Sequence, residues 1–236
     1  MRLRCVATIA LSSLTLLAAS PVVPADQPKS ASTQPPPVVV SVEQMIKDAG
    51  ELMDLKRWDH AIELLTLALE IEPKNGMAYA NRALSYGWTN RLEEASRDLA
   101  AAEKLIPGRA IIHRVRAVIA DRRSDEDTEL AELSKSLELE PGNPMALRFR
   151  AWILHRKGRE ADALADADAY IRHRPENPDA YALKADLLRA QQRLDLAAEE
   201  ANRLTELFPG NAYAMAAAAR IYSANGDRTR ALQLIT

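Results

Sequence analysis

The chain has 236 residues, a formal net charge of -2, 5% aromatic residues and one cysteine. The near-zero charge predicts no strong electrostatic attraction to nucleic acid. No stretch rich in Val, Ile and Thr alternates with a period of two, which argues against a sheet, so we expect an all-α protein forming one domain or one short repeat array.

The first 25 residues have the pattern of a secretory signal peptide. Two arginines precede an uncharged apolar run at residues 6–19, and the small residue Ala25 precedes Asp26, which favours cleavage after Ala25. The run is shorter than the roughly 18 apolar residues of a spanning helix, so we expect no stable membrane insertion after cleavage; an uncleaved anchor is the alternative. Cleavage also removes Cys5, which leaves no thiol for disulfides or zinc. We expect a periplasmic or secreted protein.

Residues 26–41 are rich in Pro, Ser and Gln, and residues 35–37 are three consecutive prolines. This composition favours an extended polyproline segment without a core. We interpret it as a disordered spacer before the first helix, with a proline-motif ligand as the alternative.

Beyond this linker, proline recurs every 34 residues: Pro73, Pro107, Pro141, Pro175 and Pro209. A fixed period of this length is typical of a repeat array. With proline at position 32, the array over 42–236 divides into about five and a half units: 42–75, 76–109, 110–143, 144–177, 178–211 and the partial unit 212–236.

Small residues align within these units. Position 8 is alanine in all six: Ala49, Ala83, Ala117, Ala151, Ala185 and Ala219. Position 20 is alanine in five units and Glu129 in the third. We expect a first helix, A, to cross a second helix, B, at these two positions, because alanine lets the two backbones approach closely. One pair cannot bury its apolar face alone, so stacking on neighbouring pairs must stabilise it.

The recurring turn predicts where helices end and begin. Proline stops helix B because it lacks an amide hydrogen. Position 34 then offers an N-cap for the next helix A in four units: Asn75, Asn143, Asn177 and Asn211. Pro144 and Pro178 suit the first helical position, and Ser41 with Gln44 predicts a capping box. Helix A is expected to end at a left-handed residue at position 15, on the pattern of Asn90, Gly158 and Gly226.

This pattern resembles the tetratricopeptide repeat (TPR) family, over about residues 42–236, in segments such as "AYANRALSYGWTNRLEEASRDLAAAEKLIPG". The resemblance implies a right-handed superhelical solenoid of antiparallel helix pairs. The third unit departs from the pattern, since Glu129 stands where alanine is expected, and its second helix is predicted to start late or to pack loosely. The last unit stops inside helix B at Thr236; a frayed end, a covering partner and a further domain are the alternatives.

The sequence carries no signature of catalysis. Four histidines stand without metal-ligand spacing: His60, His113, His155 and His173. We expect no metal, no cofactor and no enzymatic activity. Asp162 and Asp166 could serve acid–base chemistry, but an exposed helix face is the preferred interpretation.

A surface is the remaining candidate site. In the family that the chain resembles, helix A positions 2, 5, 9, 12 and 13 line a concave, peptide-binding face, and we expect this stripe not to overlap the core. In and beside the stripe of units 2–4, nine residues are candidates: Asn81, Trp88, Arg114, Arg122, Arg148, Phe149, Trp152, His155 and Arg156. Arginine can hold a carboxylate and aromatic rings supply apolar area, which predicts a partner with acidic and apolar residues. The alternative is that Trp88 and Trp152 only pad the inner curve.

In the family that the chain resembles, a five-residue carboxylate clamp binds the acidic tails of heat-shock chaperones. Only Asn81 matches it, because Ile46, Gly50, Ile111 and Val115 occupy the other four positions, so this ligand class is not expected. We therefore predict a non-enzymatic protein–protein interaction scaffold. Two alternatives stay open: an adaptor segment of a larger secreted enzyme such as a peptidase, and a homo-oligomer assembled through the uncapped last repeat.

Overall fold

The computed structural model describes residues 41–234, so the predicted signal peptide and nearly all of the linker lie outside the described residues. Within this range the chain forms twelve α-helices and no strand. The helices are α1 (Val42–Asp54), α2 (Trp58–Ile71), α3 (Gly76–Trp88), α4 (Leu92–Leu105), α5 (Ala110–Arg122), α6 (Glu126–Leu139), α7 (Pro144–Arg156), α8 (Glu160–His173), α9 (Pro178–Ala190), α10 (Leu194–Leu207), α11 (Ala212–Ala224) and α12 (Arg228–Gln233).

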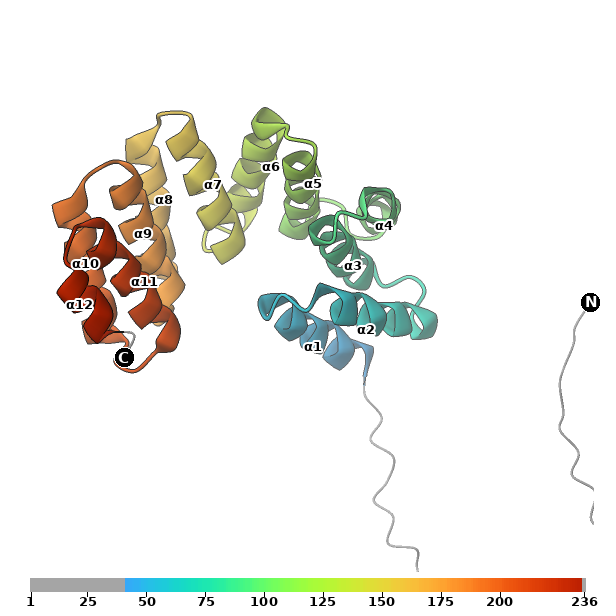
Figure 1. Cartoon of the computed structure of the whole chain (residues 1–236). Coiled ribbons are helices and arrows are strands. Elements are labelled where there is room, and N and C mark those ends of the chain that lie inside the picture. The colour runs from blue at the N-terminus through green and yellow to red at the C-terminus, as the bar shows by residue number, and fades with distance from the viewer. Residues whose placement is uncertain (1–40, 235–236) are drawn as a thin grey trace, which may run out of the picture. The chain divides into compact units, whose positions relative to one another are not determined.

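The helices form sequential antiparallel pairs, as the 34-residue period predicts (Figure 1). The odd-numbered helices are the A helices, of 13 residues each, and the even-numbered helices are the B helices, of 14 residues up to α10. The sixth B helix, α12, has six residues in the described range. The all-α fold of paired helices is confirmed.

The alanines of positions 8 and 20 were predicted to lie where each A helix crosses its B helix. Every one of them is buried, with at most 8% of its surface exposed. A larger side chain at the crossing would separate two backbones that are in close contact. Their burial agrees with the predicted close packing of each pair.

The recurring turn also forms as predicted. The four asparagines at position 34 each accept a hydrogen bond from an amide in the first turn of the next helix, at 2.9–3.1 Å. The capping box was only half right: Ser41 Oγ accepts from the Gln44 amide at 3.1 Å, but Gln44 Nε2 donates forward to Asp48 at 2.6 Å. One helical turn brings Asp48 within reach of Gln44, and this acceptor replaces the backbone of Ser41.

The left-handed residue at position 15 occurs in all six units. Gly158 and Gly226 have φ of 72° and 82°, and four other residue types adopt φ of 58–61°: Lys56, Asn90, Ser124 and Gln192. The prediction from three sequence positions thus extends to every unit, including those in which the residue type gives no hint of it.

The third unit corrects an expectation. Helix α6 begins at the same position of the unit as the other B helices, has 14 residues, and packs closely on α5, so a late start was wrong. Glu129 is buried, with 4% of its surface exposed. Its side chain borders a small cavity lined also by residues of α3, α5 and α7, and α5 and α7 approach each other less closely than the other neighbouring A helices do.

An ion-pair ladder, which the sequence analysis missed, runs through units 2–5. A cation at position 7 of helix A contacts a buried acid at position 23 of its own helix B: Arg82–Asp98, Arg116–Glu132, Arg150–Asp166 and Lys184–Glu200. The predicted exposed face is therefore wrong for Asp166, which is buried. Asp162 is exposed, as predicted, and pairs with Arg159.

Candidate functional site

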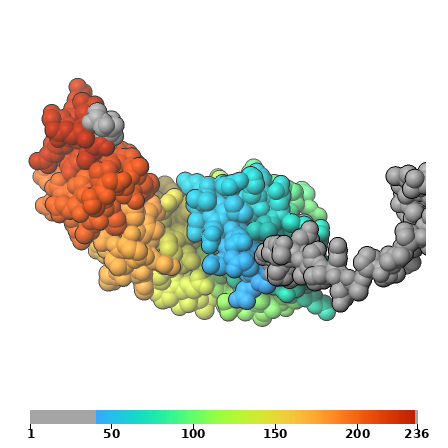
Figure 2. All heavy atoms as spheres, turned by 90° about the horizontal axis from the view of Figure 1, so that it is seen from below, coloured from blue at the N-terminus to red at the C-terminus, as the bar shows by residue number. Residues whose placement is uncertain are grey.

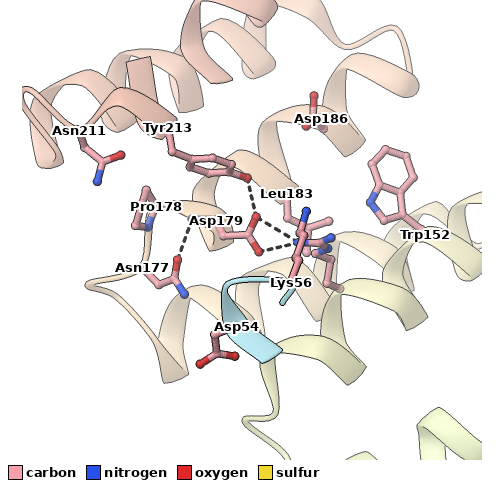
Figure 3. Close-up of a pocket in the computed structure, with 11 residues that line it drawn as sticks. Asp54, Lys56, Trp152, Asn177, Pro178, Asp179, Leu183, Asp186, Asn211 and Tyr213 are labelled. Atoms are coloured by element: carbon pink, nitrogen blue, oxygen red, sulfur yellow. Dashed lines mark hydrogen bonds and ion pairs between the residues drawn. The ribbon is translucent and has the colours of Figure 1, made fainter. Parts of the chain in front are cut away.

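A pocket of about 610 Å³ opens on the A-helix side of the array. We call it the A-helix pocket, and it is lined by Asp54, Lys56, Arg148, Trp152, Asn177, Pro178, Asp179, Leu183, Asp186, Asn211 and Tyr213 (Figure 3). The residues come from the α1–α2 turn on one side and from units 4–6 on the other. In Figure 2 the atoms of the first unit (blue) lie beside those of the fourth (yellow), which agrees with this lining.

Asp179 is the best-connected polar group of the A-helix pocket. Its carboxylate accepts hydrogen bonds from Arg148 Nη1 at 3.1 Å, Tyr213 Oη at 2.5 Å and Tyr170 Oη at 3.2 Å. Burial, together with the Asp179 charge, raises the pKa of both tyrosines well above the usual range, so both hydroxyls stay protonated and donate. The network fixes one wall of the pocket and engages Arg148.

Three other donors that line the pocket have no acceptor among residues 41–234. They are the Lys56 ammonium, the Trp152 indole Nε1–H and the Asn211 Nδ2 amide, whose Oδ1 caps α11. Pro178 and Leu183 lie among them and supply apolar surface (Figure 3). Unpaired donors beside apolar side chains can receive carbonyl or carboxylate oxygens of a bound chain.

A second group of residues forms an aromatic cluster from three units. The Trp88 ring stacks on Trp58 at a centroid distance of 5.6 Å and contacts Phe149 at 5.2 Å. The guanidinium of Arg122 lies over the Trp88 ring at 5.1 Å. Trp88, Arg122 and Phe149 were candidates from sequence, whereas Trp58 was missed because it lies in a B helix.

The remaining candidates are engaged within the chain. Four of the predicted arginines pair with the protein's own carboxylates: Arg114 with Glu140, Arg122 with Asp121, Arg148 with Asp179 and Arg156 with Glu126. His155 pairs with Glu160 at 2.8 Å and stacks its ring edge against Trp152. The A-helix pocket contains two of the nine candidates, Arg148 and Trp152, and the aromatic cluster contains three, Trp88, Arg122 and Phe149. The other four lie in neither place, and the role of all nine in binding stays a prediction.

The predicted separation of the inner stripe from the core was wrong in units 2 and 3. Four stripe residues are buried between α3 and α5: Ala80, Leu84, Ile111 and Val118. A Cβ on Gly87 would come within 2.7 Å of Val118 Cγ1. Adjacent A helices stack directly through these residues, which leaves units 4–6 to line the A-helix pocket.

Comparisons with known proteins agree with this architecture. Residues 130–178 and 156–212 match the family model described as Tetratricopeptide repeat. The chain is 44% identical over 62 residues to Tetratricopeptide repeat protein 36 of Caenorhabditis elegans, which covers 26% of this chain and 35% of that protein. The chain thus matches the TPR family over residues 130–212. It is also 30% identical over 103 residues to a DnaJ homolog subfamily C member 7 homolog of Dictyostelium discoideum, over 41% of this chain and 19% of that protein.

Solved structures with the TPR fold align with most of this chain. The TPR protein TTC0263 of Thermus thermophilus aligns with a TM-score of 0.65 and 17% identity over 78% of this chain and 99% of that one. PilW, a type IV pilus biogenesis factor, aligns with a TM-score of 0.63 and 19% identity over 82% and 90%. Identities this low show the fold alone. The chain spans only about a fifth to a third of the two curated relatives above.

Several residues that line the A-helix pocket were not predicted from the sequence. Asp179 and Asp186 are positions 2 and 9 of unit 5, and Tyr213 is position 2 of unit 6. Applying the same stripe positions to those two units would have found all three. Lys56 and Asp54 gave no such signal, because they reach the A-helix pocket from the first unit.

The single match to the TPR carboxylate clamp stands alone in the structure. Asn81 is half-buried, and within residues 41–234 its side chain makes no hydrogen bond. Ile111 and Val115, at two other clamp positions, are buried in the core. Among residues 41–234 no group of three or more His, Cys, Asp or Glu side chains could hold a metal ion, and no helix is long and apolar enough to cross a membrane.

Proposed function

We propose that this TPR protein is a non-catalytic scaffold that binds a short peptide segment in the A-helix pocket. TPR proteins are typically protein–protein interaction scaffolds. The observation that carries the specific proposal is the set of three donors without acceptors among residues 41–234, on Lys56, Trp152 and Asn211, in a pocket of about 610 Å³.

The proposed ligand is a segment with an apolar residue beside an acidic one. The apolar side chain packs on Trp152 and Leu183, and its burial drives association. Lys56 receives the neighbouring carboxylate, because Arg148 is already held by Asp179. The indole and the Asn211 amide donate to backbone carbonyls, a role that does not depend on the ligand sequence.

Fluorescence anisotropy with a labelled peptide array tests this proposal. We expect peptides that pair an aromatic or leucine residue with an adjacent Asp or Glu to bind, and the same peptides with Asn or Gln to bind more weakly. For the best peptide, Lys56→Gln is expected to raise Kd by roughly tenfold, the value of one charge-assisted hydrogen bond. Trp152→Ala is expected to raise it further.

Lys47→Gln is the matched control, because Lys47 is an exposed lysine of the same unit that does not line the pocket. An unchanged Kd in both Lys56→Gln and Trp152→Ala would remove the proposed site. Equal weakening by Lys47→Gln would show that only the general surface charge matters.

We also propose a periplasmic or secreted location, supported by the charge and apolar pattern of residues 1–25. The exported protein is expected to start at Asp26, which intact mass spectrometry of exported material would show. A protein that keeps residues 1–25 or stays in the cytoplasm would contradict this proposal.

A further inference from the structure

Helix α2 carries an apolar stripe on its outer side. Leu64, Leu67 and Ile71 are positions 23, 26 and 30 of unit 1, and spacings of three and four residues place them on one helix face. Leu64 is partly buried, whereas Leu67 and Ile71 expose 51% and 59% of their surfaces. Units 2–5 have no such stripe, because they carry an acid at position 23 and Ala, Lys or Arg at position 26.

In the other units this face of the B helix lies toward the preceding repeat. Arg82, at position 7 of unit 2, bonds Asp98 at position 23 and also reaches Thr66 of the preceding B helix at 3.1 Å. Unit 1 forms one end of the array, and no helix of residues 41–234 lies beyond it (Figure 1). Within the described residues, the face that elsewhere meets a preceding repeat is therefore uncovered on α2.

Unit 1 is also acidic, and its charges are unpaired. Residues 42–75 contain eight acidic and four basic residues, whereas residues 76–236 contain 24 of each. Every ion pair in the described part of the chain is made by residues from Arg82 onward, so no acid of unit 1 has a cation there. The net negative charge of the array is thus concentrated in its first unit.

Position 7 brings this charge to the apolar stripe. Units 2–5 have the cation of the ion-pair ladder at this position, and unit 1 has Asp48. Since position 7 contacts position 23 in the ladder, the repeat geometry places Asp48 beside Leu64. The Asp48 carboxylate accepts one hydrogen bond, from Gln44 Nε2 at 2.6 Å, and is not neutralised by it. We call the surface formed by Asp48, Leu64, Leu67 and Ile71 the end face.

We propose that the end face docks a helix of a partner protein, apolar on one side and flanked by Lys and Arg. The apolar residues of that helix cover the stripe on α2, and its cations pair with Asp48 and with the exposed acids Glu63 and Glu70 of α2. A helix suits this face because each repeat of the array stacks helix against helix, and because rows spaced three and four residues apart interdigitate.

The end face is independent of the peptide-binding proposal, since none of its residues lines the A-helix pocket. Its charge also disfavours a second copy of the chain docked through the same surface, because two acidic faces would repel each other.

Fluorescence anisotropy with a labelled synthetic helix tests the proposal on the full chain. The probe has about 15 residues, with leucine at every third or fourth position and lysine beside each leucine. One control peptide replaces the lysines by glutamate, and another replaces the leucines by serine. We expect saturable binding of the leucine–lysine probe, weaker at higher salt, and no saturable binding of either control peptide.

The apolar part of the end face is tested by a pair of substitutions. Leu67→Ser combined with Ile71→Ser should weaken binding of the probe by roughly tenfold or more, because the buried apolar contact is lost. The matched control is Leu139→Ser combined with Leu207→Ser, since both leucines are exposed and stand at position 30 of units 3 and 5. This control should leave the affinity unchanged.

The charge of the end face is tested separately. Asp48→Asn keeps the size of the side chain and should weaken binding by about threefold, the value of a partly exposed ion pair. Glu138→Gln removes an exposed acid of α6 and should have no effect. Circular dichroism checks that every variant is folded.

The other possible occupants give different results. Light scattering that shows a dimer, dissociated by Leu67→Ser with Ile71→Ser, would assign the end face to a second copy and overturn the proposal. The probe would not bind saturably if residues 26–40 of the chain itself cover the end face, and that result would also overturn it. Equal binding of the glutamate peptide, or equal weakening by the matched control pair, would contradict the proposal as well.

Discussion

At position 15, the turn between helices A and B dictates the backbone conformation of a single residue. All six units require a left-handed backbone there, yet only two supply glycine, and Lys56, Ser124 and Gln192 adopt φ of 58–59°. A side chain with a Cβ is strained in this region by about 1 kcal/mol. The tight A–B connection occurs in all six units despite this strain.

Replacing Gln192 by glycine should therefore stabilise the protein by about 0.5–1 kcal/mol, since the relief of strain exceeds the greater backbone entropy of an unfolded glycine. The side chain of Gln192 is exposed, so no packing is lost. The reciprocal change, Gly158→Ala, should destabilise by a similar amount; a Cβ there meets no atom within 4 Å. Urea denaturation of both variants checks the prediction, and a Gly158→Ala protein as stable as wild type would contradict it.

At the scale of helices, the ion-pair ladder joins each A helix to its own B helix and to the preceding one. Arg150 bonds Asp166 through two nitrogens at 2.6 and 2.8 Å and reaches Ser134 of the preceding B helix. The hydrogen bonds that Arg150 donates to Asp166 raise the pKa of Arg150, and Asp166 itself is 5% exposed. Removing either partner would leave a buried charge without a counter-ion. The pair therefore favours the one orientation of the two helices in which both charges meet.

Arg150→Leu should accordingly destabilise the protein by about 2–3 kcal/mol, because it strands the Asp166 carboxylate. Replacing both residues, as Arg150→Leu with Asp166→Leu, should recover more than half of that loss. The control is Arg159→Leu, in an exposed pair with Asp162, with an expected change under about 0.5 kcal/mol. Thermal melting followed by circular dichroism distinguishes the three, and a double variant no better than Arg150→Leu would contradict the argument.

At the scale of the whole array, the buried core divides into three clusters that partly buried residues such as Met53 and Met145 link. Three apolar clusters centre on unit 1, on units 2 and 3, and on the units that follow, and α5 and α7 make the loosest contact between neighbouring A helices. The Trp88–Phe149 contact crosses this junction and joins unit 2 directly to unit 4. Nearest-neighbour stacking alone does not predict such a contact.

A double-mutant cycle tests that link. Trp88→Ala and Phe149→Ala should show a coupling free energy of about 0.5–1.5 kcal/mol, as expected for aromatic rings in contact. The reference cycle combines Trp88→Ala with Tyr181→Ala; the Tyr181 ring packs on Phe208 in another part of the array. Equal coupling in the two cycles would mean that units 2 and 4 do not interact directly.

Much of the fold could be predicted because its determinants are local. The asparagine caps, the proline after each B helix and the alanines at the crossing each act within a few residues or within one pair, and all were placed correctly. Glu129 showed the limit of this approach. The sequence marked it as an exception, but only the tertiary structure showed that α6 keeps its register and that Glu129 is buried.

The candidate site was harder to predict, for a physical reason. By itself the sequence determined the paired helices, their 34-residue register and the residues that could face inward. Only the tertiary structure decided which of those residues are free. Arg148 and Asp179 lie 31 positions apart and meet only when units 4 and 5 stack, and Lys56 reaches the A-helix pocket from a unit far away in the chain. Whether a charge is paired depends on such distances between repeats, which a period in the sequence does not encode.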